Sequence, residues 1–159
     1  MTIVAKLRRQ FRPGSIDEVR VGTIEAAPGV VAPALAYADA DSWAAAKHDN
    51  PGELATRPLG DHPFGSYRVT AVRWSTTDDE RQHYGPVRLV LDPLAGEALA
   101  AKNNGRIGLC IHGGPTREGA FRATNGCLRV YDRTAVALAN AAEVELAAGR
   151  SVPYDCQEI

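Results

Sequence analysis

The chain has 159 residues, 45% of them hydrophobic, which is enough for one globular domain with a single core. Its 18 basic and 19 acidic side chains leave a net charge of −1, without the basic surplus that nucleic-acid-binding proteins usually carry. No apolar run approaches the roughly 20 residues that a bilayer-spanning helix needs, so no membrane span is expected.

The first half of the chain predicts a hairpin, a helix and a long loop. Residues 2–11 and 19–24 have the alternation of strands, and Pro13 and Gly14 between them indicate a turn. An Asp start and an Ala-rich interior favour a short helix over residues 39–48. Residues 50–65 are rich in Pro and Gly and predict a loop of a length that is often functional.

The second half adds further strands and two helices. Strands are expected at residues 67–74, 87–91, 106–112 and 151–156, and helices at residues 94–102 and 132–148. Asp132 is expected to cap the second of these helices, with Gly149 just beyond its end. We see no internal repeat or linker, so the fold class is mostly β (α+β minor), a single domain over residues 1–159 with two or three short helices.

Three cysteines, Cys110, Cys127 and Cys156, leave at least one free thiol. No CxxC pair is present, which argues against a zinc ribbon or a thioredoxin-like motif. Cys110 and His112 would share one strand face, so a metal site with Cys127 is conceivable. No fourth ligand is evident, and we expect no metal and no cofactor.

The most informative stretch is CIHGGPTREGAFRATNGCLRVY, over residues 110–131. A predicted buried strand ends at His112, and Cys127 follows a Gly-rich loop, just before an expected helix. A free thiol has a pKa of about 8.5, so only about 3% of it is ionised at pH 7. His112, Arg129 and the helix opening near Asp132 would each lower that pKa. Alone, either a cysteine or a histidine is more often structural, but this pair in a glycine-rich frame favours catalysis.

These residues resemble the signature of the L,D-transpeptidase catalytic domain, the YkuD-type family. The matches are Ile111-His112-Gly113 and Thr124-Asn125-Gly126-Cys127-Leu128-Arg129, after an upstream His62-Pro63-Phe64-Gly65 that leads into a strand. The resemblance covers residues 61–159 and implies a β-sandwich or barrel. Two departures stand out, because Asn125 replaces the usual His and only 15 positions separate His112 from Cys127.

The resemblance implies that the Cys127 thiolate attacks the carbonyl between the third and fourth residues of a peptidoglycan tetrapeptide stem. D-Ala leaves and a thioester forms, which an amine, a free D-amino acid or water then resolves. His112 would act as the base, oriented by the Gly113 carbonyl. Backbone N–H groups of Gly126 and Cys127 are oxyanion-hole candidates.

Four residues are candidates for substrate binding: Arg129, Asn125, Thr124 and Tyr84. Arg129 would hold a stem carboxylate, with a structural salt bridge as the alternative. Tyr84 and Trp74 would line the cleft for the stem peptide, and the alternative for both is core packing. The expected partners are peptidoglycan stem peptides, with no nucleic acid, and the oligomeric state stays open.

The resemblance also implies a site of action in the periplasm or cell envelope, although the N-terminus lacks the apolar core of a signal peptide. Two alternatives stay open. Asn125 raises the possibility of a module that binds wall peptides and has lost catalysis. The lone-domain layout without a visible signal raises that of an antibacterial effector with the same chemistry.

Overall fold

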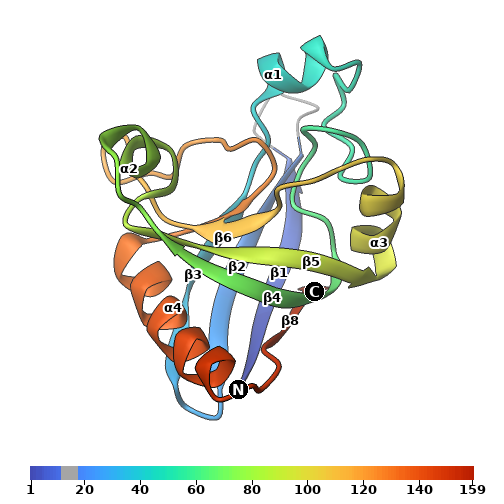
Figure 1. Ribbon diagram of the computed structural model, residues 1–159. Helices are drawn as coiled ribbons and strands as arrows, with labels where there is room; N and C mark the ends of the chain where they lie inside the picture. The colour runs from blue at the N-terminus through green and yellow to red at the C-terminus, as the bar shows by residue number, and fades with distance from the viewer. Residues whose placement is uncertain (12–17) are drawn as a thin grey trace.

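The computed structural model describes residues 1–11 and 18–159, and its strands close into a barrel (Figure 1). The strand order around the barrel is β1-β2-β3-β7-β6-β5-β4-β8. In chain order the strands are β1 (Thr2–Phe11), β2 (Glu18–Ala27), β3 (Val31–Ala38), β4 (Gly65–Trp74), β5 (Val87–Ala95), β6 (Cys110–His112), β7 (Leu128–Val130) and β8 (Pro153–Glu158). The mostly-β prediction is therefore confirmed. The turn predicted at Pro13 and Gly14 lies outside the described residues.

The barrel interior is built from alternate residues of each strand, because successive side chains of a strand point to opposite faces. Ile3, Ala5 and Leu7 of β1 are fully buried, and their neighbours reach the surface. The large rings of Tyr67 and Tyr154 fill the space between β4 and β8 and stack with centroids 5.1 Å apart. This alternation explains why strand positions could be predicted from the sequence.

Strand β3 was not predicted, because Pro33 stands inside it and proline cannot donate to a strand ladder. The pairing of β2 with β3 explains how the proline is accommodated. Its register shifts between Ile24 and Ala26, and this irregularity lies opposite the residues around Pro33. A bulge leaves a residue unpaired, so the missing N–H costs no ladder bond here.

The described residues contain four helices, where two or three were expected. They are α1 (Ser42–Lys47), α2 (Asp78–Tyr84), α3 (Gly96–Asn103) and α4 (Asp132–Ala147). Helix α1 is shorter than predicted because the Asp41 side chain caps it, accepting from Ala44 N at 2.8 Å. The unpredicted α2 begins with a reciprocal cap: Thr77 accepts from Glu80 N, and the Glu80 carboxylate accepts from Thr76 N.

Two predictions around the candidate nucleophile are wrong. The strand expected over residues 106–112 contains only Cys110–His112. Cys127 is followed by strand β7 rather than by a helix, and α4 begins only at Asp132, with Tyr131 as its N-cap residue. Helix α4 therefore contributes no N-terminal dipole at Cys127. The Asp132 carboxylate makes no capping bond and instead accepts from Gly114 N at 2.7 Å.

In the part of the chain that the structure describes, no helix has the length and apolar character needed to cross a membrane.

Candidate active site

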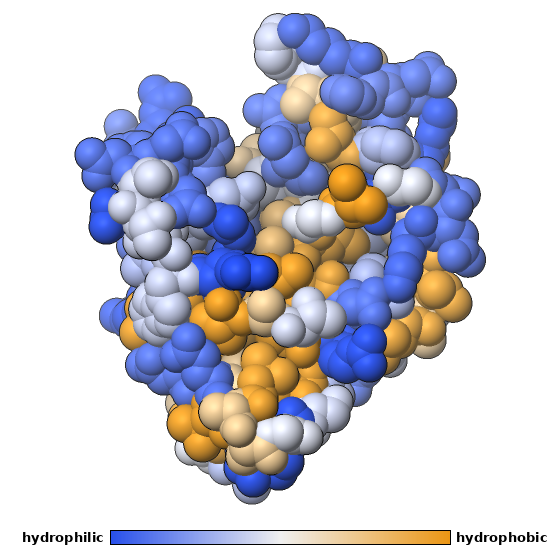
Figure 2. Space-filling view, in the orientation of Figure 1, coloured by the Kyte–Doolittle hydropathy of each residue, from blue (hydrophilic) through white to orange (hydrophobic). Residues whose placement is uncertain are grey.

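A cavity of about 540 Å³ opens between two lobes at one end of the barrel. The space-filling view shows this hollow between the lobe that carries α2 and the lobe that carries α1 (Figure 2). Its lining comes from segments far apart in the sequence: Asp41, Leu59, Gln82, His83, Tyr84, Ile107, Gly108, His112, Pro115, Arg122, Ala123, Thr124, Asn125, Cys127 and Arg129. All the predicted catalytic and binding side chains are among them.

The parallel pair β6 and β7 brings the key residues together. Ile111 pairs with Leu128 and His112 with Arg129, and the first of these pairs is fully buried in the barrel core. The side chains before and after it point to the opposite face, because strand residues alternate. That face carries Cys110 and His112 from one strand and Cys127 and Arg129 from the other.

The His112 ring is held by its own loop. Its Nδ1 lies 2.7 Å from the Gly113 carbonyl oxygen. A carbonyl only accepts, so Nδ1 carries the hydrogen and Nε2 is the nitrogen available to a neighbouring thiol. The Tyr84 ring meets the imidazole edge-on, with centroids 5.3 Å apart and an interplanar angle of 85°. The Gly113 contact predicted from the sequence is therefore present.

Gly113 itself must be glycine for steric reasons. A Cβ at this position would lie 2.1 Å from the Asp132 Oδ1 atom, and the Gly113 N–H donates to the Tyr84 carbonyl at 3.1 Å. The backbone after His112 is thereby fixed from both sides, and with it the carbonyl that orients the imidazole.

Cys127 has the electrostatic surroundings of a thiolate. The neighbouring Cys110 is the largest influence, and together with His112 it holds the pKa of the Cys127 thiol well below its ordinary value. Burial acts in the opposite direction and is outweighed. The Cys110 and Cys156 thiols have raised pKa values, to about 12 for Cys156 because of burial. Among the three cysteines, Cys127 is thus the nucleophile candidate.

The turn before Cys127 differs from the predicted one in two respects. The Gly126 N–H donates to Thr124 Oγ1 at 3.1 Å, so the expectation that it serves as a free oxyanion donor is wrong in this structure. The Thr124 hydroxyl donates to the Cys127 carbonyl at 3.0 Å, which makes Thr124 a residue that shapes the turn rather than a free substrate contact. Asn125 is exposed and lines the cavity.

Arg129 is buried, yet no acidic side chain among the described residues forms a salt bridge with its guanidinium. One terminal nitrogen donates to the Pro115 carbonyl, and Nε has no hydrogen-bond partner. Burial, reinforced by the charge of Arg122, lowers the pKa of Arg129. The charge of Asp132 acts in the opposite direction on that pKa, although the two side chains form no salt bridge. A buried cation that forms no salt bridge and lines a cavity is suited to bind a carboxylate.

Arg106, whose role was not predicted from the sequence, supports the turn before Cys127. Buried Arg106 donates to the carbonyls of Ala55, Gly60 at 2.5 Å, Asp61 at 2.6 Å and Gly126 at 3.1 Å. It thereby connects the loop before β4 to the turn before Cys127. The sequence gives only a weak signal for this role of Arg106, because an arginine after a glycine does not reveal which carbonyl groups it will contact.

His62, the first residue of the motif before β4, is fully buried on the other side of the same carbonyl. Its Nδ1 lies 3.3 Å from the Gly126 oxygen, and Tyr154 OH lies 3.2 Å from its Nε2. Burial, reinforced by the charge of Arg106, lowers the pKa of His62 to about 3, so the ring is neutral. The upstream motif therefore contacts the nucleophile turn directly.

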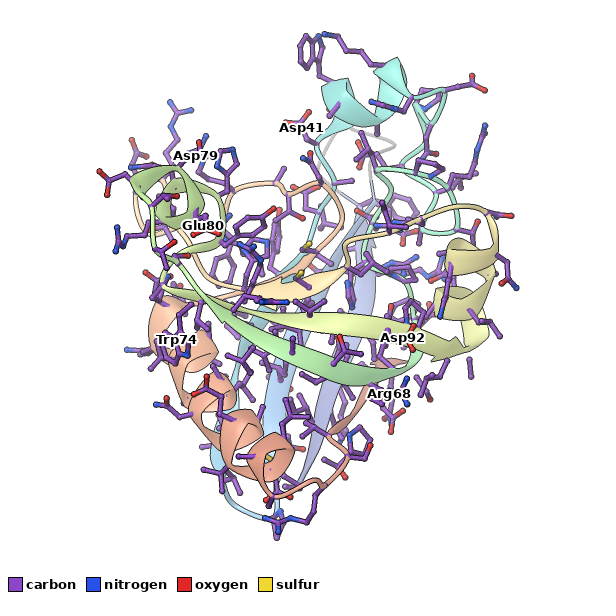
Figure 3. All side chains as sticks on the ribbon, viewed as in Figure 1. Asp41, Arg68, Trp74, Asp79, Glu80 and Asp92 are labelled. Atoms are coloured by element: carbon purple, nitrogen blue, oxygen red, sulfur yellow. The ribbon has the colours of Figure 1, made fainter. Side chains whose placement is uncertain are left out.

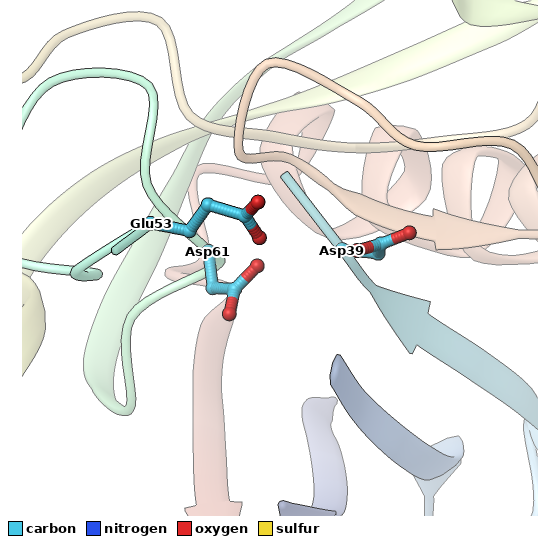
Figure 4. A group of neighbouring side chains, drawn as sticks. All are labelled: Asp39, Glu53 and Asp61. Carbon is cyan, nitrogen blue, oxygen red and sulfur yellow. The ribbon is translucent and has the colours of Figure 1, made fainter. Parts of the chain in front are cut away.

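A group of buried carboxylates is formed by Asp39, just after β3, and by Glu53 and Asp61 of the loop between α1 and β4 (Figure 4). Their oxygens come within 4.8 Å of one another, the spacing of metal ligands, and the described residues offer no other such group. The metal site considered at Cys110, His112 and Cys127 does not have this spacing. Asp39 accepts from Tyr37 OH at 2.9 Å and Asp61 from Ala40 N at 2.8 Å. Burial raises the pKa of Asp61 to about 7.

Acidic side chains stand at the rim. In Figure 3, Asp41 and the pair Asp79 and Glu80 lie on opposite sides of the opening. Trp74 lies away from the cavity, is 41% exposed and donates from Nε1 to Glu143 at 2.7 Å, so it neither lines the cleft nor packs in the core.

Comparison with known proteins does not supply a family for this site. No family model matches the chain, and neither a curated protein nor a solved structure shows significant similarity to it.

Proposed function

We propose that the protein is a cysteine-dependent acyltransferase of the L,D-transpeptidase type that acts on peptidoglycan tetrapeptide stems. The observation that carries the proposal is the arrangement on one face of β6 and β7. A thiol with a lowered pKa, a histidine with a fixed tautomer and a buried arginine without an acidic partner line one cavity. Under this proposal the protein acts in the periplasm or cell envelope.

The first half of the reaction makes a thioester. The Cys127 thiolate attacks the carbonyl carbon between the third and fourth stem residues, and the Cys127 N–H is the remaining oxyanion donor of the predicted pair. The tetrahedral intermediate collapses, the peptide C–N bond breaks, and His112 gives its proton to the departing D-Ala amine. Arg129 binds a stem carboxylate through charge-assisted hydrogen bonds.

The second half releases the acyl group. An acceptor amine from another stem gives a 3-3 cross-link, a free D-amino acid gives exchange, and water gives the carboxypeptidase product. His112, now neutral, takes the proton of the attacking nucleophile, so the same residue acts as acid and then as base. The cavity is open on the solvent side, where an acceptor can enter beside the exposed Asn125.

The test is incubation of the protein with tetrapeptide muropeptides, followed by mass spectrometry of the products. Loss of D-Ala, or its exchange for an added D-amino acid, is expected with the wild-type protein and not with Cys127→Ala. Cys156→Ala is the matched control and should retain activity, since Cys156 lies in the barrel core and not on the cavity. Unchanged muropeptides, or full turnover by Cys127→Ala, would overturn the proposal.

A further inference from the structure

A second thiol, that of Cys110, lies next to Cys127 on the neighbouring strand. Cys110 is one position before Ile111 on β6, and Cys127 is one position before Leu128, the residue that pairs with Ile111. The two cysteines are therefore cross-strand neighbours on one face of a parallel pair. Both are buried, but Cys127 lines the cavity and Cys110 does not. Substrate can reach Cys127 without touching Cys110.

Both thiols converge on one acceptor. Cys110 Sγ lies 3.4 Å and Cys127 Sγ lies 3.6 Å from the Gly108 carbonyl oxygen. When both cysteines are neutral, each can donate its S–H to that oxygen. When Cys127 ionises, its contact with the carbonyl becomes unfavourable, because two acceptors then face each other without a hydrogen between them. The thiolate needs another donor in place of the lost interaction.

From this geometry, and resting on the proposed acyl-transfer function, we propose that Cys110 is a positioning residue that donates its S–H to the Cys127 thiolate. The Cys110 hydrogen rotates from the Gly108 oxygen to the Cys127 sulfur as Cys127 loses its proton to His112. No bond to sulfur other than S–H changes, and Cys110 stays protonated throughout. The Cys127 thiolate then has a donor in Cys110 as well as the partner His112.

Cys110 is suited to remain the donor because the neighbouring Cys127, and then burial, raise its pKa. Other titratable groups also face Cys127 or its cavity, and their charges are the same whether or not Cys110 is replaced. They come from every element around it: His83 and Tyr84 of α2, Arg106 before β6, His112 of β6, Arg122 of the following loop, Arg129 of β7 and Asp41 before α1. A change at Cys110 alone therefore isolates the thiol–thiol contact.

The test is the pH dependence of Cys127 alkylation by iodoacetamide, read peptide by peptide by mass spectrometry in the full chain. Cys110→Ala removes the donor and should raise the pH midpoint of Cys127 alkylation by about one unit, so that the rate falls about tenfold at a pH well below both midpoints. Cys110→Ser keeps a donor and should hold the midpoint within a few tenths of wild type. Cys156→Ala is the matched control and should leave the midpoint unchanged.

Unfolded chain would react with the midpoint of an ordinary thiol, so alkylation of the buried Cys156, read in the same digest, reports whether a variant is folded. The inference is overturned if Cys110→Ala has the wild-type midpoint, or if Cys110→Ser shifts as far as Cys110→Ala, since packing alone would explain that. Alkylation needs no peptidoglycan, which separates the two proposals. If Cys110→Ala shifts the alkylation midpoint but the wild-type protein leaves muropeptides unprocessed, only the proposed function is refuted. If muropeptides are processed but Cys110→Ala leaves the midpoint unchanged, only this inference is refuted.

Discussion

The imidazole of His112 donates from Nδ1 to the carbonyl oxygen of the adjacent Gly113 at 2.7 Å, and this contact fixes the tautomer of the ring. With Nδ1–H committed to a backbone carbonyl, Nε2 is the only ring nitrogen that can take the Cys127 proton. A carboxylate fills this orienting role in many catalytic triads. Here the backbone does so, and it is fixed because Gly113 is wedged between Tyr84 and Asp132.

The thiolate of Cys127 should therefore depend on His112. His112→Gln removes the imidazolium charge, and since an adjacent cation lowers the pKa of a thiol, the variant should have a higher Cys127 pKa. The alkylation rate of Cys127 should drop about tenfold at a pH well below both pKa values, and the wild-type rate should persist well below the pH range of an ordinary thiol. His83→Gln, also on the cavity, is the control. Equal pH profiles for wild type and His112→Gln would refute the pairing.

Arg129 should contribute to substrate affinity. Arg129→Gln removes the buried cation without removing an acidic partner, so the KM for tetrapeptide stems should rise about tenfold or more, with a smaller change in kcat. Arg133→Gln, whose guanidinium lies over the Tyr131 ring outside this cavity, should leave KM unchanged. Steady-state kinetics with a soluble muropeptide makes the comparison. An unaltered KM in Arg129→Gln would assign that residue a purely structural role.

Gly126 should tolerate no side chain. Its φ of 102° is strained for other residues, and a Cβ would lie 1.8 Å from the Arg106 guanidinium and 2.4 Å from the Gly60 oxygen. Gly149→Ala is a matched control, since Gly149 also has a positive φ but has open space around it. We expect a loss of about 1 kcal/mol in unfolding free energy for Gly149→Ala and about 3 kcal/mol or more for Gly126→Ala. Urea denaturation measures both, and similar losses would argue against the Arg106 contact.

Two buried groups should oppose each other in the pH dependence of stability. Asp61, with a pKa raised to about 7, stabilises the fold fully below its unfolded pKa of about 3.8, and this is lost as pH rises toward 7. His62, with a pKa lowered to about 3, stabilises it fully above about pH 6.5, and this is lost as pH falls. Between about pH 4 and 6.5 each contributes a slope of up to about 1.4 kcal/mol per pH unit, with opposite signs.

Asp61→Asn removes one of these slopes and keeps an acceptor for Ala40 N. The variant should therefore lose stability on acidification more steeply than wild type, because the His62 term is no longer offset. Unfolding free energies from urea titrations at pH 4.5, 5.5 and 6.5 would show this. Parallel curves for the two proteins would mean that Asp61 is ionised in the folded state across this range.

Most strands could be predicted from the sequence because apolar and polar residues alternate along them, and this alternation matches the burial observed in β1 and β4. It missed β3, where a bulge absorbs Pro33, because that strand depends on a pairing that a local pattern does not contain. It also missed α2, although the Thr77-x-x-Glu80 start of this helix is a local capping signature, in which Thr77 accepts from Glu80 N.

At the site, the residues brought to the cavity were predicted, but several of their roles were not. Thr124 and Gly126 bond to each other instead of facing substrate. Arg106 and His62 act through contacts across 20 and 64 positions of sequence, which no spacing rule reveals. The placement of Cys110 beside Cys127 depends on a parallel register between strands that are each three residues long.

The central claim is that Cys127 becomes acylated by a stem peptide, and intact-protein mass spectrometry tests it most directly. The wild-type protein, mixed with a tetrapeptide stem at low pH and quenched within seconds, should gain the mass of the stem without its terminal D-Ala, located on Cys127 by peptide mapping. Cys127→Ala should gain none. A wild-type protein that stays at its own mass while the stem is cleaved, or an adduct that persists in Cys127→Ala, would contradict the account.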